Sequence, residues 1–123
     1  PARIKTARAH PLRAAVATRF TQSADPYVLV GGAQIAADWA ALIDGAIDVP
    51  INRDENGDPI SSEILFVWTG TSAMGTGVSP CCEDWTTTSS GAAKGMTDAT
   101  DAKWSFNTGM NCSELAHLYC FEQ

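Results

Sequence analysis

All four cysteines lie in the C-terminal half of the chain, and their spacing limits the possible folds more than any other feature. Cys81 and Cys82 are adjacent, and Cys112 and Cys120 lie eight residues apart near the end. No C-x-x-C pair is present, which argues against a zinc knuckle or a thioredoxin-like redox site. Zinc bound by these cysteines and His117 is a weaker alternative. We therefore expect disulfides, which form in oxidising compartments and indicate a secreted or cell-surface protein.

The segments around the cysteines are poor in large apolar side chains. Residues 69–80 and 86–103 are rich in Gly, Ser, Thr and Ala, so we expect both to be long loops. Compact domains keep such loops when they are functional or held by cross-links. The chain also contains four tryptophans, and large aromatic rings in a small protein usually fill its core. We expect three of them to be core residues, namely Trp39, Trp68 and Trp85.

The length of 123 residues and the ordinary composition favour one α+β domain with a modest core. High β-propensity predicts strands at residues 27–30, 64–68 and 116–121. The second of these is apolar on both faces, so it should be central and buried. No apolar run is long enough for a membrane helix, so we expect no membrane span.

Two segments favour helix. Ile35, Trp39, Leu42 and Ile43 fall at i, i+4, i+7 and i+8, which is the apolar stripe of a short helix. Residues 2–20 are rich in Ala and Arg and also read as helical, with an interruption at a proline.

Charge is distributed unevenly along the chain. Residues 1–24 carry five basic and no acidic side chains, whereas the remainder carries three basic and fourteen acidic ones, a net charge of −11. We interpret residues 1–25 as a basic arm or connector and residues 26–123 as the folded domain. An acidic body repels phosphate, so nucleic acid is not an expected partner. The arm could instead support self-assembly by docking on a neighbour's acidic body.

One segment has oxygen side chains that a calcium loop would use. Asp54, Asn56 and Asp58 alternate around Gly57, with Glu63 further on. A hard cation prefers several oxygens at one point, but the spacing departs from that of a complete calcium loop. Asn-Gly next to Asp is also typical of a hairpin turn, which we favour, with calcium as the alternative cofactor and no other cofactor expected.

Signals for catalysis are weak. No nucleophile elbow, phosphate-binding loop or zinc-protease motif occurs in the sequence. A hydrolase-type enzyme would need convergent polar groups, for which His117, Glu83, Asp84 and Glu114 are the candidates if they meet in space. We therefore expect a non-enzymatic protein.

A set of short motifs, in a fixed order, resembles the endostatin-like domain, a compact variant of the C-type lectin fold. The closest resemblance is to bacterial endostatin-like domains of secreted proteins and surface lipoproteins, including leptospiral adhesins. It covers about residues 26–122. The motifs are Trp39-x-x-Leu42 with Gly45, Val67-Trp68-x-Gly70, Cys82-Glu83-x-Trp85, Cys112, and Leu118-x-Cys120-x-Glu122.

The resemblance implies an α+β fold with a twisted, mostly antiparallel sheet, few helices and long loops pinned by disulfides. It pairs Cys82 with Cys112 and joins Cys120 to a cysteine of an N-terminal helix. No cysteine precedes Cys81 here. Either the family's first helix and strand are missing from this chain, or Cys81 pairs with Cys120.

The resemblance also implies binding rather than catalysis. The expected function is a non-catalytic extracellular binding or adhesion module that recognises a protein or matrix component, or a glycan, through residues 69–80 and 86–111. The lectin tripeptides that bind sugar through calcium do not occur in the sequence. The alternatives are a structural subunit of an extracellular assembly and a hydrolase built on the same fold.

Overall fold

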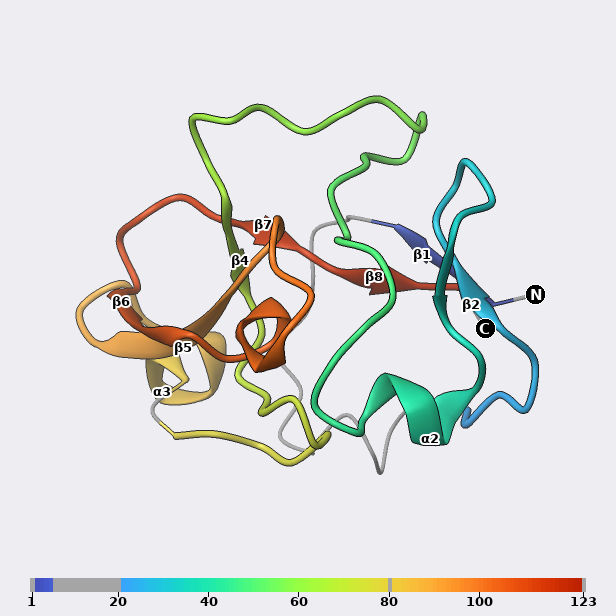
Figure 1. Ribbon diagram of the computed structural model, residues 1–123. Coiled ribbons are helices and arrows are strands. Elements are labelled where there is room, and N and C mark those ends of the chain that lie inside the picture. The colour runs from blue at the N-terminus through green and yellow to red at the C-terminus, as the bar shows by residue number, and fades with distance from the viewer. Residues whose placement is uncertain (1, 6–20, 80, 123) are drawn as a thin grey trace.

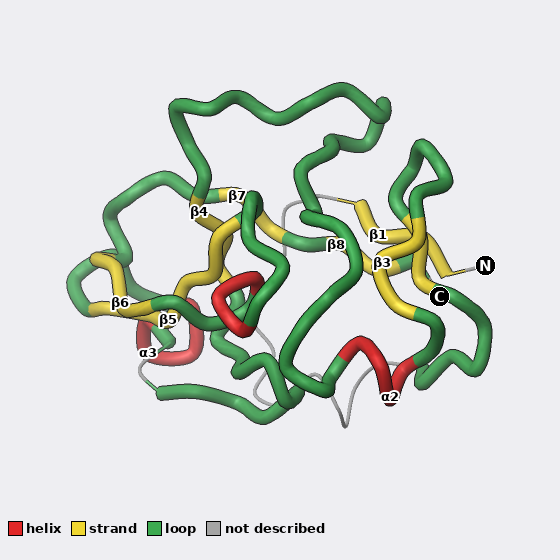
Figure 2. The backbone as a smooth tube through the Cα atoms, in the orientation of Figure 1, coloured by secondary structure: helices red, strands yellow, loops and turns green. Residues whose placement is uncertain are grey.

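The computed structural model describes residues 2–5, 21–79 and 81–122, which form two small four-stranded sheets with few helices (Figure 1). Much of the chain between these elements is loop (Figure 2). The elements in chain order are β1 (Ala2–Lys5), β2 (Tyr27–Val28), β3 (Gln34–Ala36), α2 (Trp39–Leu42), β4 (Phe66–Trp68), α3 (Cys82–Trp85), β5 (Gly91–Met96), the 3₁₀ helix η1 (Ala102–Trp104), β6 (Thr108–Asn111), β7 (His117–Leu118) and β8 (Cys120–Phe121).

Both sheets are mixed but mainly antiparallel. The first has the strand order β3-β2-β1-β8, and the second has the order β6-β5-β4-β7. Only the β1–β2 and β4–β7 pairings are parallel among the described strands. The expected α+β class with few helices is therefore correct.

The final segment of the chain joins the two sheets. We expected a single strand at residues 116–121, but β7 pairs with β4 in the second sheet and β8 pairs with β1 in the first. Tyr119 lies between them in the chain. Figure 1 shows the red segment crossing from β7 in one sheet to β8 in the other. One extended segment thus completes both sheets, because each half finds a different partner.

The start of the chain differs from the expected helical arm. Residues 2–5 form β1, which lies between β2 and β8, so this part of the basic segment belongs to the first sheet. Residues 6–20, the rest of the expected helix, lie outside the described residues. No helix among residues 2–5, 21–79 and 81–122 has the length and apolar character needed to cross a bilayer.

The main core lies beside the first sheet and includes Trp39 and Trp104. The apolar stripe that predicted one helix is divided: Ile35 lies in β3, and the helix begins only at Trp39. The Asp38 carboxylate accepts a hydrogen bond from the Ala41 backbone N–H at 2.8 Å and so starts the helix at that point. Strand and helix residues both reach the same core, which is why their spacing resembled that of a single helix.

The largest error in the sequence-based prediction concerns residues 86–103. They contain β5, which lies between β4 and β6 inside the second sheet, and not only loop. Ala and Gly are depleted in strands, so the sequence Gly91–Met96 gave no strand signal. The expected strand at residues 64–68 is present over Phe66–Trp68 as β4. It is central in the second sheet as predicted, but only Val67 is fully buried, and Phe66 and Trp68 are half-buried.

Tyr119 ties the core to η1, and its ionisation should influence stability at high pH. Its hydroxyl donates a hydrogen bond to the Trp104 carbonyl at 3.0 Å. Burial, together with the negative charge of Asp98, raises the pKa of Tyr119 far above its usual range. The unfolded chain loses this proton near pH ~10, while the folded protein keeps it. The contribution of the protonated Tyr119 to the free energy of unfolding is therefore fully present below pH ~10 and is lost as the pH rises above it.

We therefore expect the free energy of unfolding to fall less steeply above pH ~10 in Tyr119→Phe than in the wild type. The difference in slope should approach about 1.4 kcal/mol per pH unit. Urea unfolding from neutral to alkaline pH measures both slopes. Parallel curves for the two proteins would show that Tyr119 titrates normally in the folded state.

Candidate functional site

The segment Cys82–Trp85 adopts an unusual left-handed turn. Its four residues have φ values of +51°, +50°, +59° and +64°, although none is glycine. The turn is closed by hydrogen bonds from the Trp85 N–H to the Cys81 carbonyl at 2.8 Å and from the Thr86 N–H to the Cys82 carbonyl at 2.9 Å. A left-handed turn of non-glycine residues costs about 1–2 kcal/mol per residue, so the surrounding structure must hold it in place.

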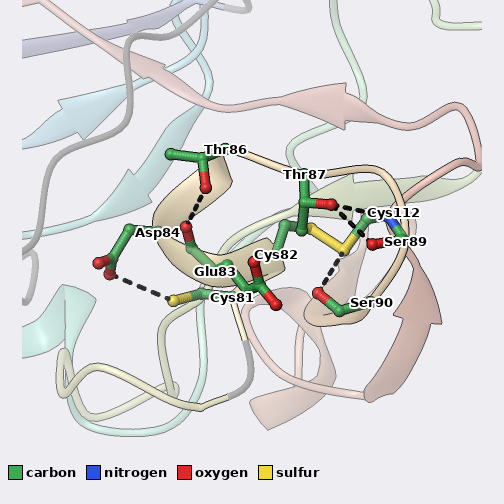
Figure 3. Close-up of a disulfide and its surroundings, with 9 residues drawn as sticks. All are labelled: Cys81, Cys82, Glu83, Asp84, Thr86, Thr87, Ser89, Ser90 and Cys112. Carbon is green, nitrogen blue, oxygen red and sulfur yellow. Dashed lines mark hydrogen bonds between the residues drawn. A yellow bond between two sulfur atoms is a disulfide. The ribbon is translucent and has the colours of Figure 1, made fainter.

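The Cys82–Cys112 disulfide is one such restraint (Figure 3). It spans 30 residues with a Cα–Cα distance of 5.8 Å and attaches the turn to the end of the β5–β6 hairpin. The Cys112 backbone N–H donates to the Ser90 carbonyl at 2.7 Å, which continues the hairpin ladder to the disulfide. This is the pairing that the resemblance implied.

Cys81 keeps its thiol, so the alternative Cys81–Cys120 bridge is not formed. The reason is the topology of the sheets. Cys81 lies beside Ala92 in an isolated antiparallel bridge at the second sheet, whereas Cys120 lies in β8 of the first sheet. Figure 3 shows the Cys81 sulfur directed toward the Asp84 carboxylate, 3.9 Å away, while Cys82 reaches in another direction to Cys112.

Trp68 and Trp85 are half-buried and not core residues, contrary to the expectation from sequence. Their rings meet edge to face, with centroids 5.9 Å apart and an interplanar angle of 71°. They belong to the second sheet and the left-handed turn, away from the main core cluster, in which Trp104 packs instead. Aromatic residues identify packing partners but do not show which face of a sheet they will cover, so the sequence could not separate these two roles.

Lys94 lies on the same face of the second sheet as Trp68, its cross-strand partner. Its side chain is 8% exposed, and its ammonium lies 3.3 Å from the centroid of the Phe66 ring. Such a cation–π contact stabilises a largely desolvated cation. Sequence reasoning missed this residue because it falls in a segment that was expected to be loop.

A shallow depression of about 400 Å³ lies on the β5–β6 hairpin. Gly91 and Gly109 contribute no side chains to it, and the polar side chains of Asn111 and Glu114 border it. Asn111, Glu114 and Gly109 are all exposed. The depression is also lined by Lys94, so one basic and one acidic side chain border it, together with main-chain atoms of the hairpin near the disulfide.

Exposed apolar side chains flank β6. Phe106 is 40% exposed just before the strand, and Leu115 is 80% exposed after the turn that follows it, between β6 and β7. The third exposed large apolar residue of the described chain, Met74, lies in the separate loop 69–79. Both side chains that flank β6 are accessible for apolar contact with another molecule.

The proposed binding loops are only partly loops. Residues 69–79 are irregular, with a tight turn in which the Ser72 N–H bonds to the Thr76 carbonyl at 2.8 Å. In the region 86–111, however, β5, η1 and β6 account for half of the residues. The exposed groups of the second region are therefore held by a sheet, because its small residues pack closely enough for strands to pair.

The calcium candidate is a tight turn in the structure. One Asp54 carboxylate oxygen accepts hydrogen bonds from the Asn56 and Asp58 N–H groups, each at 2.9 Å, and Arg53 pairs with Pro59 across the turn. No group of three or more His, Cys, Asp or Glu side chains suited to a metal ion occurs within residues 2–5, 21–79 and 81–122. Calcium binding by Asp54, Asn56 and Asp58 stays a prediction.

The polar residues considered for catalysis lie in different surroundings. A ring nitrogen of His117 in β7 is 3.0 Å from the Ile64 carbonyl, within hydrogen-bond distance. Glu83 and Asp84 belong to the left-handed turn, and Glu114 borders the depression. Of the residues singled out from sequence, the structure gathers Cys82, Cys112 and Glu114 at one end of the β5–β6 hairpin.

Comparison with family models and with curated protein sequences finds no match for the chain.

Proposed function

We propose that this protein is a non-catalytic binding module of an extracellular compartment that recognises a protein partner through the surface around β6. The observation that carries the proposal is the exposure of Phe106, just before β6, and of Leu115, after the turn that follows it. Burial of exposed apolar side chains against a partner is the main favourable contribution to association. The disulfide beside the strand keeps this surface ordered before binding, which lowers the entropy lost on association.

The proposed location, secreted or at the cell surface, is supported by the disulfide, since such bonds persist in oxidising compartments. The proposed family is the endostatin-like branch of the C-type lectin fold, supported by the ordered motifs around Trp39, Trp68 and Cys82. Adhesion to a protein or matrix component is the form of binding that fits both proposals.

A binding screen with the oxidised full chain tests this function. We expect saturable binding to at least one purified matrix or cell-surface protein in surface plasmon resonance. The double variant Phe106→Ser/Leu115→Ser should weaken that binding by about tenfold or more, because it removes two apolar contacts.

Met74→Ser supplies a matched control, since it also removes an exposed apolar side chain but lies outside the proposed surface. It should bind like the wild type. Binding to glycans alone would contradict a protein partner. Equal losses in the control and the double variant would show that the surface around β6 is not the binding surface.

A further inference from the structure

The open edge of β6 is the feature of this surface that points to a particular kind of partner. β6 is the outermost strand of the second sheet in the part of the chain that the structure describes, and its other edge is paired with β5. We propose that this edge receives an extended, basic peptide segment of the partner protein as an added strand. The inference rests on the proposed function and specifies its mode of recognition.

The hydrogen-bonding direction along β6 follows from the hairpin register. The Cys112 N–H points inward to the Ser90 carbonyl, and successive residues of an antiparallel strand alternate in direction. The backbone N–H and carbonyl groups of Met110 therefore point toward β5, while those of Gly109 and Asn111 point away from it. The Asn111 carbonyl accepts from the Glu114 N–H at 3.0 Å, so the outward groups are the Gly109 N–H and carbonyl and the Asn111 N–H.

An added strand needs close access to these groups, and Gly109 provides it. A Cβ atom at this position would meet nothing nearer than the Ala92 carbonyl at 3.8 Å, so the strand is uncrowded there. Gly109 and Gly91 together leave the depression open on the hairpin. A side chain of the added strand can lie over these glycines without displacing any part of the protein.

The ends of the edge supply apolar contacts. Phe106 and Leu115 lie beyond the two ends of Thr108–Asn111 and are exposed. A peptide that pairs with β6 would extend past both ends of this short strand, where these two exposed side chains are available for contact. Main-chain hydrogen bonds with flanking side-chain contacts are the usual basis of recognition by strand addition.

Charge selects among peptides. The described residues contain fourteen acidic and five basic side chains, and both Glu114 and Lys94 line the depression. The ammonium of Lys94 is held over Phe66. A basic segment is therefore attracted by the net negative charge of the protein, whereas an acidic segment would be repelled.

The experiment uses the oxidised full chain and a short peptide of alternating valine and lysine as the probe. Isothermal titration should show binding that weakens as salt is added. Two further peptides test the two parts of the proposal on the unaltered protein. N-methylation of alternate backbone amides, or replacement of lysine by glutamate, should each weaken binding by about tenfold or more.

Two variants at one position test the edge itself. Gly109→Pro removes the outward N–H and obstructs an added strand, yet an edge strand tolerates proline because that N–H does not bond to β5. The affinity of this variant for the valine–lysine peptide should fall to the affinity of the wild type for the N-methylated peptide. Gly109→Ala retains the N–H, and its new methyl group makes only an ordinary van der Waals contact with the Ala92 carbonyl. This variant should therefore retain most of the affinity for the peptide.

The proposal is overturned if the valine–lysine peptide does not bind, if the N-methylated peptide binds equally well, or if Gly109→Pro binds like Gly109→Ala. Should Gly109→Pro fail to fold, the N-methylated peptide on the wild type decides the question alone. These outcomes leave the proposed function to its own test, because Phe106→Ser/Leu115→Ser measures partner binding without reference to strand addition.

Discussion

Gly95→Ala is expected to lower the free energy of unfolding by about 3 kcal/mol or more, because β5 and the η1 segment approach too closely for any side chain. A Cβ at Gly95 would overlap the Trp104 carbonyl oxygen and would lie 3.0 Å from the Ser105 carbonyl carbon. Both are backbone atoms, so neither can rotate away. Relief would require a shift of η1 or β5, and each is held by further contacts.

The hydrogen bonds around η1 explain why such a shift is costly. The Thr69 hydroxyl donates to the Ser105 carbonyl at 2.6 Å, and the buried Ser105 hydroxyl donates to the Thr71 carbonyl at 2.7 Å. A displaced η1 would break these bonds and leave buried polar groups without partners. It would also move Trp104, which packs in the main core.

Gly109→Ala is the matched control, since it makes the same change in the neighbouring strand of the same hairpin. Its new methyl group would meet only the Ala92 carbonyl at 3.8 Å. We expect its free energy of unfolding to stay within about 0.5 kcal/mol of the wild type. Urea denaturation followed by tryptophan fluorescence measures both variants. Equal stabilities for Gly95→Ala and Gly109→Ala would mean that η1 does not lie against β5 as described.

The close approach at Gly95 also explains what the sequence could and could not predict. Strands rich in β-branched and aromatic residues, such as Phe66–Trp68, were located because their side chains favour an extended backbone. β5 was missed because its Ala and Gly residues serve a different requirement, the close packing of backbone on backbone. Periodicity and propensity depend on the side chains, so a strand made mainly of small residues gives no strand signal in the sequence.

The candidate site was predictable in its cross-link but not in its shape. The resemblance implied the Cys82–Cys112 pair, and the structure contains it. The left-handed turn at Cys82–Trp85 could not be foreseen, because non-glycine residues disfavour positive φ and only tertiary restraints maintain it. The exposure of Phe106 and Leu115 was likewise invisible, since an apolar residue in a sequence is ordinarily expected to be buried.

Removal of the disulfide is the second change with a large expected effect. Cys82→Ser/Cys112→Ser should lower the free energy of unfolding by about 3–4 kcal/mol, since the bond closes a loop of 30 residues in the unfolded chain. Both cysteines must be replaced, because a single substitution would leave a new thiol able to pair with Cys81. Urea denaturation of the oxidised proteins measures the loss.

Cys81→Ser provides the control for this change. Its thiol forms no disulfide, so we expect a free energy of unfolding within about 0.5 kcal/mol of the wild type. Wild type treated with reductant should match the double variant. A double variant as stable as the wild type would show that the fold does not depend on the cross-link.

The same double variant also shows what holds the left-handed turn. Without the disulfide, the turn at Cys82–Trp85 loses a restraint that offsets a cost of about 1–2 kcal/mol per residue, so we expect it to relax to right-handed or extended backbone. Trp85 would then leave the edge-to-face contact with Trp68, and the near-ultraviolet circular dichroism of this pair should weaken under conditions where the core remains folded. If the signal persists, packing of Trp85 beside Gly70 is sufficient to maintain the turn, and the disulfide acts only on the unfolded chain.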